Sequence, residues 1–265
     1  MKTYWFTIAC NPKFETLSQG LLNTADHHGI KIHRITHSIV NSEDKANPFH
    51  RESRRNILKL KIDSILSAPT GYDRIVYVDA DTLIVNPNGF ERLCGSLKEP
   101  WPTGRSPVPK KASWSQKQLF QRRLWALLKK ENLTSFCPGG IDFRQEWNSG
   151  VIAGDRQFME DLATEWARWW DLLLEVCDGY FERDQLSYKF AYTQVARIRY
   201  GFETIPKEYN CIVKRMGFLP AAHLLHRAGL SKSEWGWKER KKKRQWAIAK
   251  QKILDNRYQS WAQKL

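Results

Sequence analysis

Two aspartates, Asp79 and Asp81, are the residues whose type and spacing most clearly suit a chemical step in this chain of 265 residues. They directly follow Arg74–Val78, a nearly continuous apolar run that predicts a buried strand. Two carboxylates placed one residue apart at a strand end diverge, so one binds a divalent cation while the other reaches the metal, a water or a sugar. Mg²⁺ and Mn²⁺ prefer such oxygen ligands, and either ion neutralises a diphosphate group as it leaves. The buried strand before the pair favours a metal site, because charges at that place need compensation.

The segments around this pair predict an α/β fold that begins with a βαβ unit. In open α/β sheets, ligands bind outside the carboxyl ends of the strands, which is where the acidic pair falls. No strand pattern is found between residues 98 and 141, and an excursion of this kind usually carries substrate contacts. We expect strands at 4–10, 31–36, 74–78 and 222–226, and helices at 15–28, 56–66, 116–130 and 156–175.

Composition and charge narrow the range of partners. The formal net charge of +15 favours phosphate-rich ligands, an anionic membrane surface or nucleic acid, and does not choose between them. The five cysteines are odd in number and widely spread, which indicates free thiols and a cytoplasmic location. No window has the ~18 apolar residues of a spanning helix, so we expect any membrane contact to be peripheral, at the inner face.

Residues 238–265 differ in composition from the rest and predict a basic helical tail. A run of Lys and Arg opens the tail, and such a helix can lie on an anionic bilayer or pack on the domain as a solvated helix. Alternatively, the tail belongs to a module that binds nucleic acid or membrane without catalysis. We expect no nucleic-acid partner, because the sequence contains no recognisable nucleic-acid-binding motif. The apolar positions of the tail lie in a helical frame: Trp246, Ile248, Ile253, Leu254, Tyr258 and Trp261.

Four segments, taken in order, resemble the GT-A glycosyltransferases, in particular the retaining family 8 type that includes lipopolysaccharide galactosyl- and glucosyltransferases and glycogenin. The first, Asp73-Arg-Ile-Val-Tyr-Val-Asp-Ala-Asp-Thr-Leu-Ile-Val85, is similar to the metal-binding segment of that family. The others are Asn148-Ser-Gly-Val-Ile152, Asp184-Gln185 and His226-Arg-Ala-Gly-Leu-Ser-Lys232. Ser233 stands where the family has Pro-Trp, and the Asp-Gln pair lacks a second Asp nearby.

This resemblance implies a single Rossmann-like GT-A domain with a mostly parallel mixed sheet at residues 1–237, which transfers a sugar from a UDP-sugar. The acceptor would be a saccharide or a lipid-linked acceptor, and the transfer would proceed with retention. The resemblance further implies that Asp79, Asp81 and His226 hold Mn²⁺ or Mg²⁺. Lys232 would contact the donor diphosphate, and Ala80 lies between the two aspartates in the donor site.

The resemblance also assigns residues to the sugar. Asn148, Ser149 and Gly150 would line the sugar and the acceptor, and Asp184 and Gln185 would lie beside the anomeric carbon. If the reaction inverts the anomeric carbon instead, Asp184 is the candidate general base.

Four further residues are placed in the nucleotide site by position rather than by motif. Thr7, Ala9 and Asn11 lie at the end of the first expected strand, where backbone and side-chain groups meet a nucleobase. Lys61 flanks the apolar stripe of its helix, where similar enzymes place a basic residue near the nucleotide.

Several of these residues have structural interpretations as well. His223 and His226 lie on nearly opposite faces of their strand, and the motif register alone favours His226 as the ligand. Asn148 and Gly150 also suit a turn and close packing, and Asp184 suits the N-cap of a helix that starts near Gln185.

A phosphatase of the haloacid dehalogenase type is the main rival. Residues 76–85 also resemble the apolar strand and DxDxT of that family, in which Asp79 would be the nucleophile and Asp81 the general acid. Asp155 follows a glycine, as in a later motif of those enzymes. The rival is disfavoured because a full βαβ unit precedes the aspartates, and because Met159 stands where an acid is expected.

Overall fold

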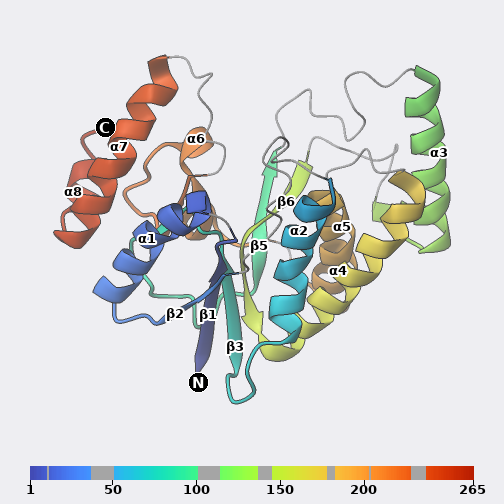
Figure 1. Ribbon diagram of the computed structural model, residues 1–265, viewed down its shortest axis with the longest axis horizontal. Helices are drawn as coiled ribbons and strands as arrows, with labels where there is room; N and C mark the ends of the chain where they lie inside the picture. The colour runs from blue at the N-terminus through green and yellow to red at the C-terminus, as the bar shows by residue number, and fades with distance from the viewer. Residues whose placement is uncertain are drawn as a thin grey trace.

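Two β-sheets and the helices that cover them form the part of the chain that the computed structural model describes (Figure 1). The described residues are 1–10, 12–36, 51–100, 114–136, 145–177, 183–202, 204–227 and 237–265. The strands are β1 (Thr3–Ile8), β2 (Ile32–Ile35), β3 (Arg74–Val78), β4 (Thr82–Ile84), β5 (Gly95–Pro100), β6 (Gln145–Asp155), β7 (Cys211–Ile212) and β8 (Leu224–His226). The α-helices are α1 (Pro12–His27), α2 (Arg51–Leu66), α3 (Trp114–Lys130), α4 (Arg156–Cys177), α5 (Arg183–Tyr192), α6 (Val213–Met216), α7 (Trp237–Leu254) and α8 (Tyr258–Ala262). The 3-10 helices η1 (Thr134–Phe136) and η3 (Lys207–Asn210) and the π-helix η2 (Thr193–Arg199) complete the helical elements. Among the described helices, none combines the length and the apolar composition that a membrane crossing requires.

The larger sheet has the strand order β2-β1-β3-β6-β5. β1 pairs in parallel with both β2 and β3, whereas β6 is antiparallel to β3 and to β5. Within this described sheet, β6 therefore runs against the other four strands. The prediction of a mixed α/β sheet with mostly parallel strands is confirmed, and the acidic pair follows the carboxyl end of β3.

A bulge in β6 brings the middle of that strand to the end of β3. Ser96 and Leu97 are neighbours on β5, yet they pair with Ile152 and Asn148 on β6. Residues 149–151 of β6 thus lie opposite no residue of β5, and bulges of this kind re-aim a strand next to functional sites. At the bulge, the backbone N–H of Asp79 donates to the carbonyl of residue 150 at 2.7 Å.

The smaller sheet has the order β4-β8-β7 and is covered by the C-terminal helices. β4 begins directly after Asp81 and pairs antiparallel with β8, so that Thr82 lies opposite His226. Ile253 of α7 and Tyr258 of α8 are buried in one apolar cluster with residues of β4 and β8. The hydroxyl of Tyr258 donates to the carbonyl of Leu219 at 2.9 Å. At these positions, the apolar side of the C-terminal helices therefore covers the smaller sheet.

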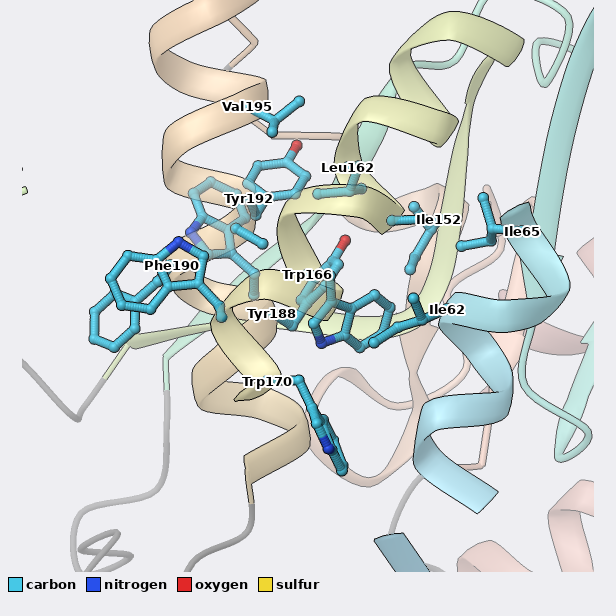
Figure 2. Close-up of a cluster of buried hydrophobic side chains, with 14 of the residues drawn as sticks. Ile62, Ile65, Ile152, Leu162, Trp166, Trp170, Tyr188, Phe190, Tyr192 and Val195 are labelled. Carbon is cyan, nitrogen blue, oxygen red and sulfur yellow. The ribbon is translucent and has the colours of Figure 1, made fainter. Parts of the chain in front are cut away.

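A core rich in tryptophan joins the larger sheet to α2, α4 and α5 (Figure 2). Trp166 on α4 is fully buried, and its indole N–H donates to the hydroxyl of Ser187 on α5 at 2.9 Å. A buried indole needs such a partner for its one polar group. Ile62 and Ile65 of α2 lie in the same cluster, which fixes α2, and with it Lys61, against the end of β3.

The strand β5 differs from what the sequence predicts, because no strand was expected from residue 98 on. β5 forms the outer edge of the larger sheet and ends at Pro100. An edge strand tolerates charged residues and proline, so Lys98 and Glu99 hide the alternating pattern. The amphipathic helix expected at 116–130 is confirmed as α3.

Candidate metal centre

Asp79, Asp81 and His226 meet at the carboxyl end of β3 and form the candidate metal centre. The Nε2 atom of His226 lies 3.5 Å from Oδ2 of Asp79 and 3.3 Å from Oδ1 of Asp81. One ligand atom from each residue lies within 4.8 Å of the other two. The three residues come from two sheets, because His226 is the last residue of β8.

Hydrogen bonds to the backbone carbonyls of the two aspartates hold them in this arrangement. The hydroxyl of Thr82 donates to the carbonyl of Asp79 at 2.8 Å, which closes the turn between β3 and β4. The backbone N–H of Arg227 donates to the carbonyl of Asp81 at 2.9 Å, which continues the pairing of β4 with β8 beyond His226. The turn and the strand pairing together bring the imidazole to the carboxylates.

The two oxygens of Asp79 have different partners. Oδ1 accepts a hydrogen bond from the Tyr77 hydroxyl and lies 3.2 Å from Nζ of Lys61, whereas Oδ2 faces His226. Burial alone would raise the pKa of the Asp79 carboxyl, but Lys61, His226 and Tyr77 together lower that pKa below its ordinary value. Asp79 is therefore held ionised, with one oxygen fixed by Lys61 and Tyr77 and the other turned toward the centre.

A chain of hydrogen bonds fixes the tautomer of His226. The backbone N–H of Gly150 donates to Oδ1 of Asn148 at 2.8 Å, so this oxygen is an acceptor. Nδ2 of Asn210 donates to the same oxygen at 2.9 Å, which turns Oδ1 of Asn210 toward Nδ1 of His226, also at 2.9 Å. An amide oxygen only accepts, so Nδ1 carries a proton. Nε2 is then the imidazole nitrogen that faces the carboxylates, as in metal sites whose histidine is oriented by an outer partner.

The charge of His226 follows from the same neighbours. Burial alone would lower the pKa of the imidazole, but hydrogen bonds and opposite charge from Asp79 and Asp81 raise it to about 10. A proton on Nε2 thus occupies the place that a cation would take between the two carboxylates.

Gly150 is at this position because no side chain fits there. A Cβ atom would lie 2.7 Å from Oδ2 of Asp79 and 2.8 Å from Oδ1 of Asn148, and would also collide with the ring of His226. The backbone of β6 therefore forms one wall of the candidate metal centre.

The donor set fits a divalent cation such as Mn²⁺ or Mg²⁺. Carboxylate oxygens suit both ions, and imidazole nitrogen is a common ligand of transition metals. Asp79 and Asp81 bring two negative charges, and Nε2 of His226 offers a lone pair to the same point once its proton has left.

The residues predicted for the nucleotide lie around the same edge of the larger sheet. Thr7 and Ala9 are fully buried at the end of β1, and Oγ1 of Thr7 has no hydrogen-bond partner within the described part of the chain. Ala80 is buried between the two aspartates. Asn11 and Lys232 lie outside the described residues.

The residues predicted for the sugar lie on β6 and α5. Nζ of Lys61 is 3.3 Å from Oγ of Ser149 and 3.4 Å from its carbonyl oxygen, so Lys61 joins the bulge of β6 to Asp79. α5 packs against β6, and Asp184 and Gln185 are in the first turn of α5, which begins one residue before Asp184. α5 thus begins two residues before the predicted start near Gln185, so Asp184 is the second residue of the helix and not its N-cap. The side chains of Asp184 and Gln185 lie outside the described part of the chain.

His223 and His226 have separate environments, which supports the choice of His226 as the ligand. The ring of His223 stacks on Tyr209 with centroids 4.2 Å apart, and its Nδ1 lies 3.2 Å from the carbonyl oxygen of Asn86. It belongs to the packing of the smaller sheet.

Tyr77 and Asn210 are two residues of this site that the sequence did not reveal. Tyr77 had a usable signal, because side chains two residues apart on a strand share a face, and Asp79 is two residues later. Asn210 is the last residue of η3 and is fully buried, and nothing in the neighbouring sequence marks an amide that touches His226.

The geometry separates this site from that of the rival phosphatase. Asp155 pairs with Arg74 at the start of β3, whereas Asp79 follows the other end of the same strand. At about 3.3 Å per residue, the two aspartates lie roughly 16 Å apart along the sheet. Asp155 instead caps α4, since its Oδ1 accepts the N–H of Phe158 at 2.8 Å.

Comparison with known proteins finds likeness in solved structures but not in sequence. No protein-family model matches the chain, and no curated protein matches it in sequence. Among solved structures, the chain is similar to a glycosyltransferase involved in the glycosylation of the major capsid of PBCV-1, with a TM-score of 0.48 and 12% identity. The likeness covers 94% of this chain and 100% of the other. Nothing about activity follows from a likeness of this size.

Proposed function

We propose that this chain is a metal-dependent glycosyltransferase that moves a hexose or related sugar from a nucleotide-sugar, a UDP-sugar, to a saccharide or lipid-linked acceptor. The observation that carries the proposal is the meeting of Asp79, Asp81 and His226 at the carboxyl end of β3. Ligands of open α/β sheets bind at this edge. The motif order that resembles GT-A enzymes adds support, because the three ligands come from its first and last segments.

Three side chains would bind the metal, and Lys61 would support them. Oδ2 of Asp79, a carboxylate oxygen of Asp81 and Nε2 of His226 would hold Mn²⁺. The ion, when bound, neutralises the diphosphate leaving group, and preorganised charge of this kind is usually the largest contribution to catalysis. Lys61 keeps Asp79 ionised and ties it to Ser149 on the wall of the site.

The proposal also covers the contacts with the nucleobase and the sugar, and the location of the protein. The buried, unpartnered hydroxyl of Thr7 is a candidate contact for the nucleobase. Transfer with retention would have the acceptor hydroxyl attack from the face that the leaving group vacates, with Asp184 and Gln185 beside the anomeric carbon. The support is the motif resemblance and the packing of α5 against β6. We propose a cytoplasmic location on the composition of the sequence alone.

Ligand binding tests the proposal directly. Thermal unfolding of the full chain with UDP, GDP or CMP, each with and without Mn²⁺, should show stabilisation by UDP only when Mn²⁺ is present, because a ligand of the native state raises stability by mass action. Asp81→Asn should lose this stabilisation and the turnover of a UDP-sugar. Asp26→Asn, which changes an exposed aspartate of α1, should keep both.

Two results would reject the proposal. One is metal-dependent cleavage of a generic phosphate ester without any response to nucleotides. The other is an Asp81→Asn variant that turns over a UDP-sugar at the wild-type rate.

A further inference from the structure

The helix α3 presents an unusual surface for a helix at the edge of a protein. Its inner side packs against α4 through a stripe that includes Leu124 and Leu128, both fully buried. Figure 1 shows α3, in green, at the outer edge of the molecule beyond α4. Its C-terminal end is tied to the body, because Glu131 forms an ion pair with Arg168 of α4. The helix is thus fixed to the molecule with one side turned outward.

That outward side combines tryptophan with positive charge. The side chains of Trp114 and Trp125 are 73% and 37% exposed, and they are the exposed members of the tryptophans that the structure describes. Arg122 and Lys129 are also exposed. With 100° between successive residues, these four side chains fall within an arc of roughly 80°, and the two indoles lie about 16 Å apart along the axis. We call these four residues the α3 face.

The charge of α3 is of one sign. Its sequence, Trp114-Ser-Gln-Lys-Gln-Leu-Phe-Gln-Arg-Arg-Leu-Trp-Ala-Leu-Leu-Lys-Lys130, contains five basic residues and no acidic one. Opposite charges one turn apart stabilise a solvated helix, and α3 contains no such pair. Leu119, which is 49% exposed, adds apolar surface at the flank of the α3 face.

We propose that the α3 face docks on the surface of an anionic lipid bilayer. Indole rings reside at the level of the lipid headgroups, and Lys and Arg beside them are attracted by acidic lipids. The contact is peripheral and reversible, since one helix with two indoles inserts only to the headgroup boundary. This inference does not depend on the sugar transfer proposed above.

The α3 face also differs from the tail that the sequence suggested as a membrane contact. In α7 and α8, Ile253 and Tyr258 are buried against the smaller sheet. On α3, the large apolar side chains remain outside after the helix has packed.

Vesicle sedimentation with the full chain tests this inference. The chain should bind vesicles that contain phosphatidylglycerol or phosphatidylserine, and binding to pure phosphatidylcholine vesicles should be at least about tenfold weaker. Trp114→Ala with Trp125→Ala should weaken binding to acidic vesicles at least about tenfold, and Arg122→Glu with Lys129→Glu should do the same. High salt should weaken the binding of the wild-type chain.

Matched controls separate the α3 face from general charge and general hydrophobicity. Leu66→Ala with Ile198→Ala removes two exposed apolar side chains elsewhere, and Lys31→Glu with Arg34→Glu changes the net charge by the same amount near β2. Both controls should bind acidic vesicles within about threefold of the wild-type chain. Thermal unfolding of every variant checks that it is folded.

Three outcomes would overturn the inference. The first is folded α3 variants that bind acidic vesicles like the wild-type chain. The second is charge controls that lose binding as strongly as the α3 variants. The third is α3 variants that keep vesicle binding but lose binding to an oligonucleotide, which would assign the α3 face to nucleic acid instead.

Discussion

At the scale of single residues, a buried amide decides which nitrogen of His226 faces the candidate metal centre. Asn210 is fixed by Asn148, and Asn148 is fixed in turn by a backbone N–H of the β6 bulge. The orientation of the imidazole is thus set by the backbone of the larger sheet, although His226 belongs to the smaller one. Outer-shell partners of this kind typically change metal affinity 10- to 100-fold when they are removed.

We therefore expect Asn210→Ala to weaken Mn²⁺ binding by about 10- to 100-fold, measured by calorimetry on the full chain. Asn210→Asp should bind Mn²⁺ more tightly than Asn210→Ala, because it restores an acceptor for Nδ1 of His226. Asn88→Ala, at an exposed asparagine, is the control and should leave binding unchanged. Equal metal affinity in the alanine and aspartate variants would show that Asn210 only fills space.

The protonation of His226 gives a second prediction at this scale. Asp79 and Asp81 raise the pKa of the imidazole to about 10, so near neutral pH the proton competes with a cation for Nε2. Raising the pH removes the competitor, and the apparent Kd for Mn²⁺ should therefore fall between pH 6 and pH 8, by up to about tenfold per pH unit. Calorimetry in buffers of different ionisation enthalpy should detect a released proton. An affinity that does not change over this range would show that His226 is not a ligand.

At the scale of elements, the sequence predicts the parts of the fold that have strong periodicity and fails where polar residues serve tertiary structure. β3 and the aspartates after it were predictable because this fully buried strand is a nearly continuous apolar run. β5 was missed because an edge strand admits Lys98, Glu99 and Pro100. Asn210 was missed because its partner His226 lies 16 residues later and meets it only when β7 pairs with β8. A contact between residues of different strands produces no periodic pattern in the sequence.

The C-terminal helices illustrate the same limit and give a third prediction. A basic amphipathic pattern does not reveal whether its apolar side faces lipid or protein, and here Ile253 and Tyr258 face the smaller sheet. Removal of residues 241–265 should therefore lower the melting temperature, since burial of each large apolar side chain contributes about 2 kcal/mol. Mn²⁺ binding should weaken as well, because Leu225, next to His226, belongs to the cluster that loses its cover.

Removal of residues 263–265 is the matched control, because these residues are exposed. The short deletion should leave the melting temperature within a few degrees of the wild-type value. If the long deletion has an unchanged melting temperature, the C-terminal helices do not support the fold.

At the scale of the whole molecule, the candidate metal centre joins two sheets. Asp79 ends a strand of the larger sheet, and His226 ends a strand of the smaller sheet that α7 and α8 cover. A cation bound by both would act as a link between these layers. Its binding free energy would then stabilise both layers, rather than the loop of the two aspartates alone.

Hydrogen exchange can detect this link, because local opening of each layer has its own free energy. With Mn²⁺ at 100 times its Kd, the native state gains about 2.7 kcal/mol, and amides of Cys211–Ile212 and Leu224–His226 should exchange more slowly. His226→Gln should abolish this protection while the larger sheet keeps its own exchange pattern. Amides of α3, which packs on α4, are the internal control. Their exchange should slow only as far as Mn²⁺ raises the free energy of global unfolding. Protection confined to residues 79–82 would show that the ion is held by the aspartates alone, and that the two layers are not coupled through it.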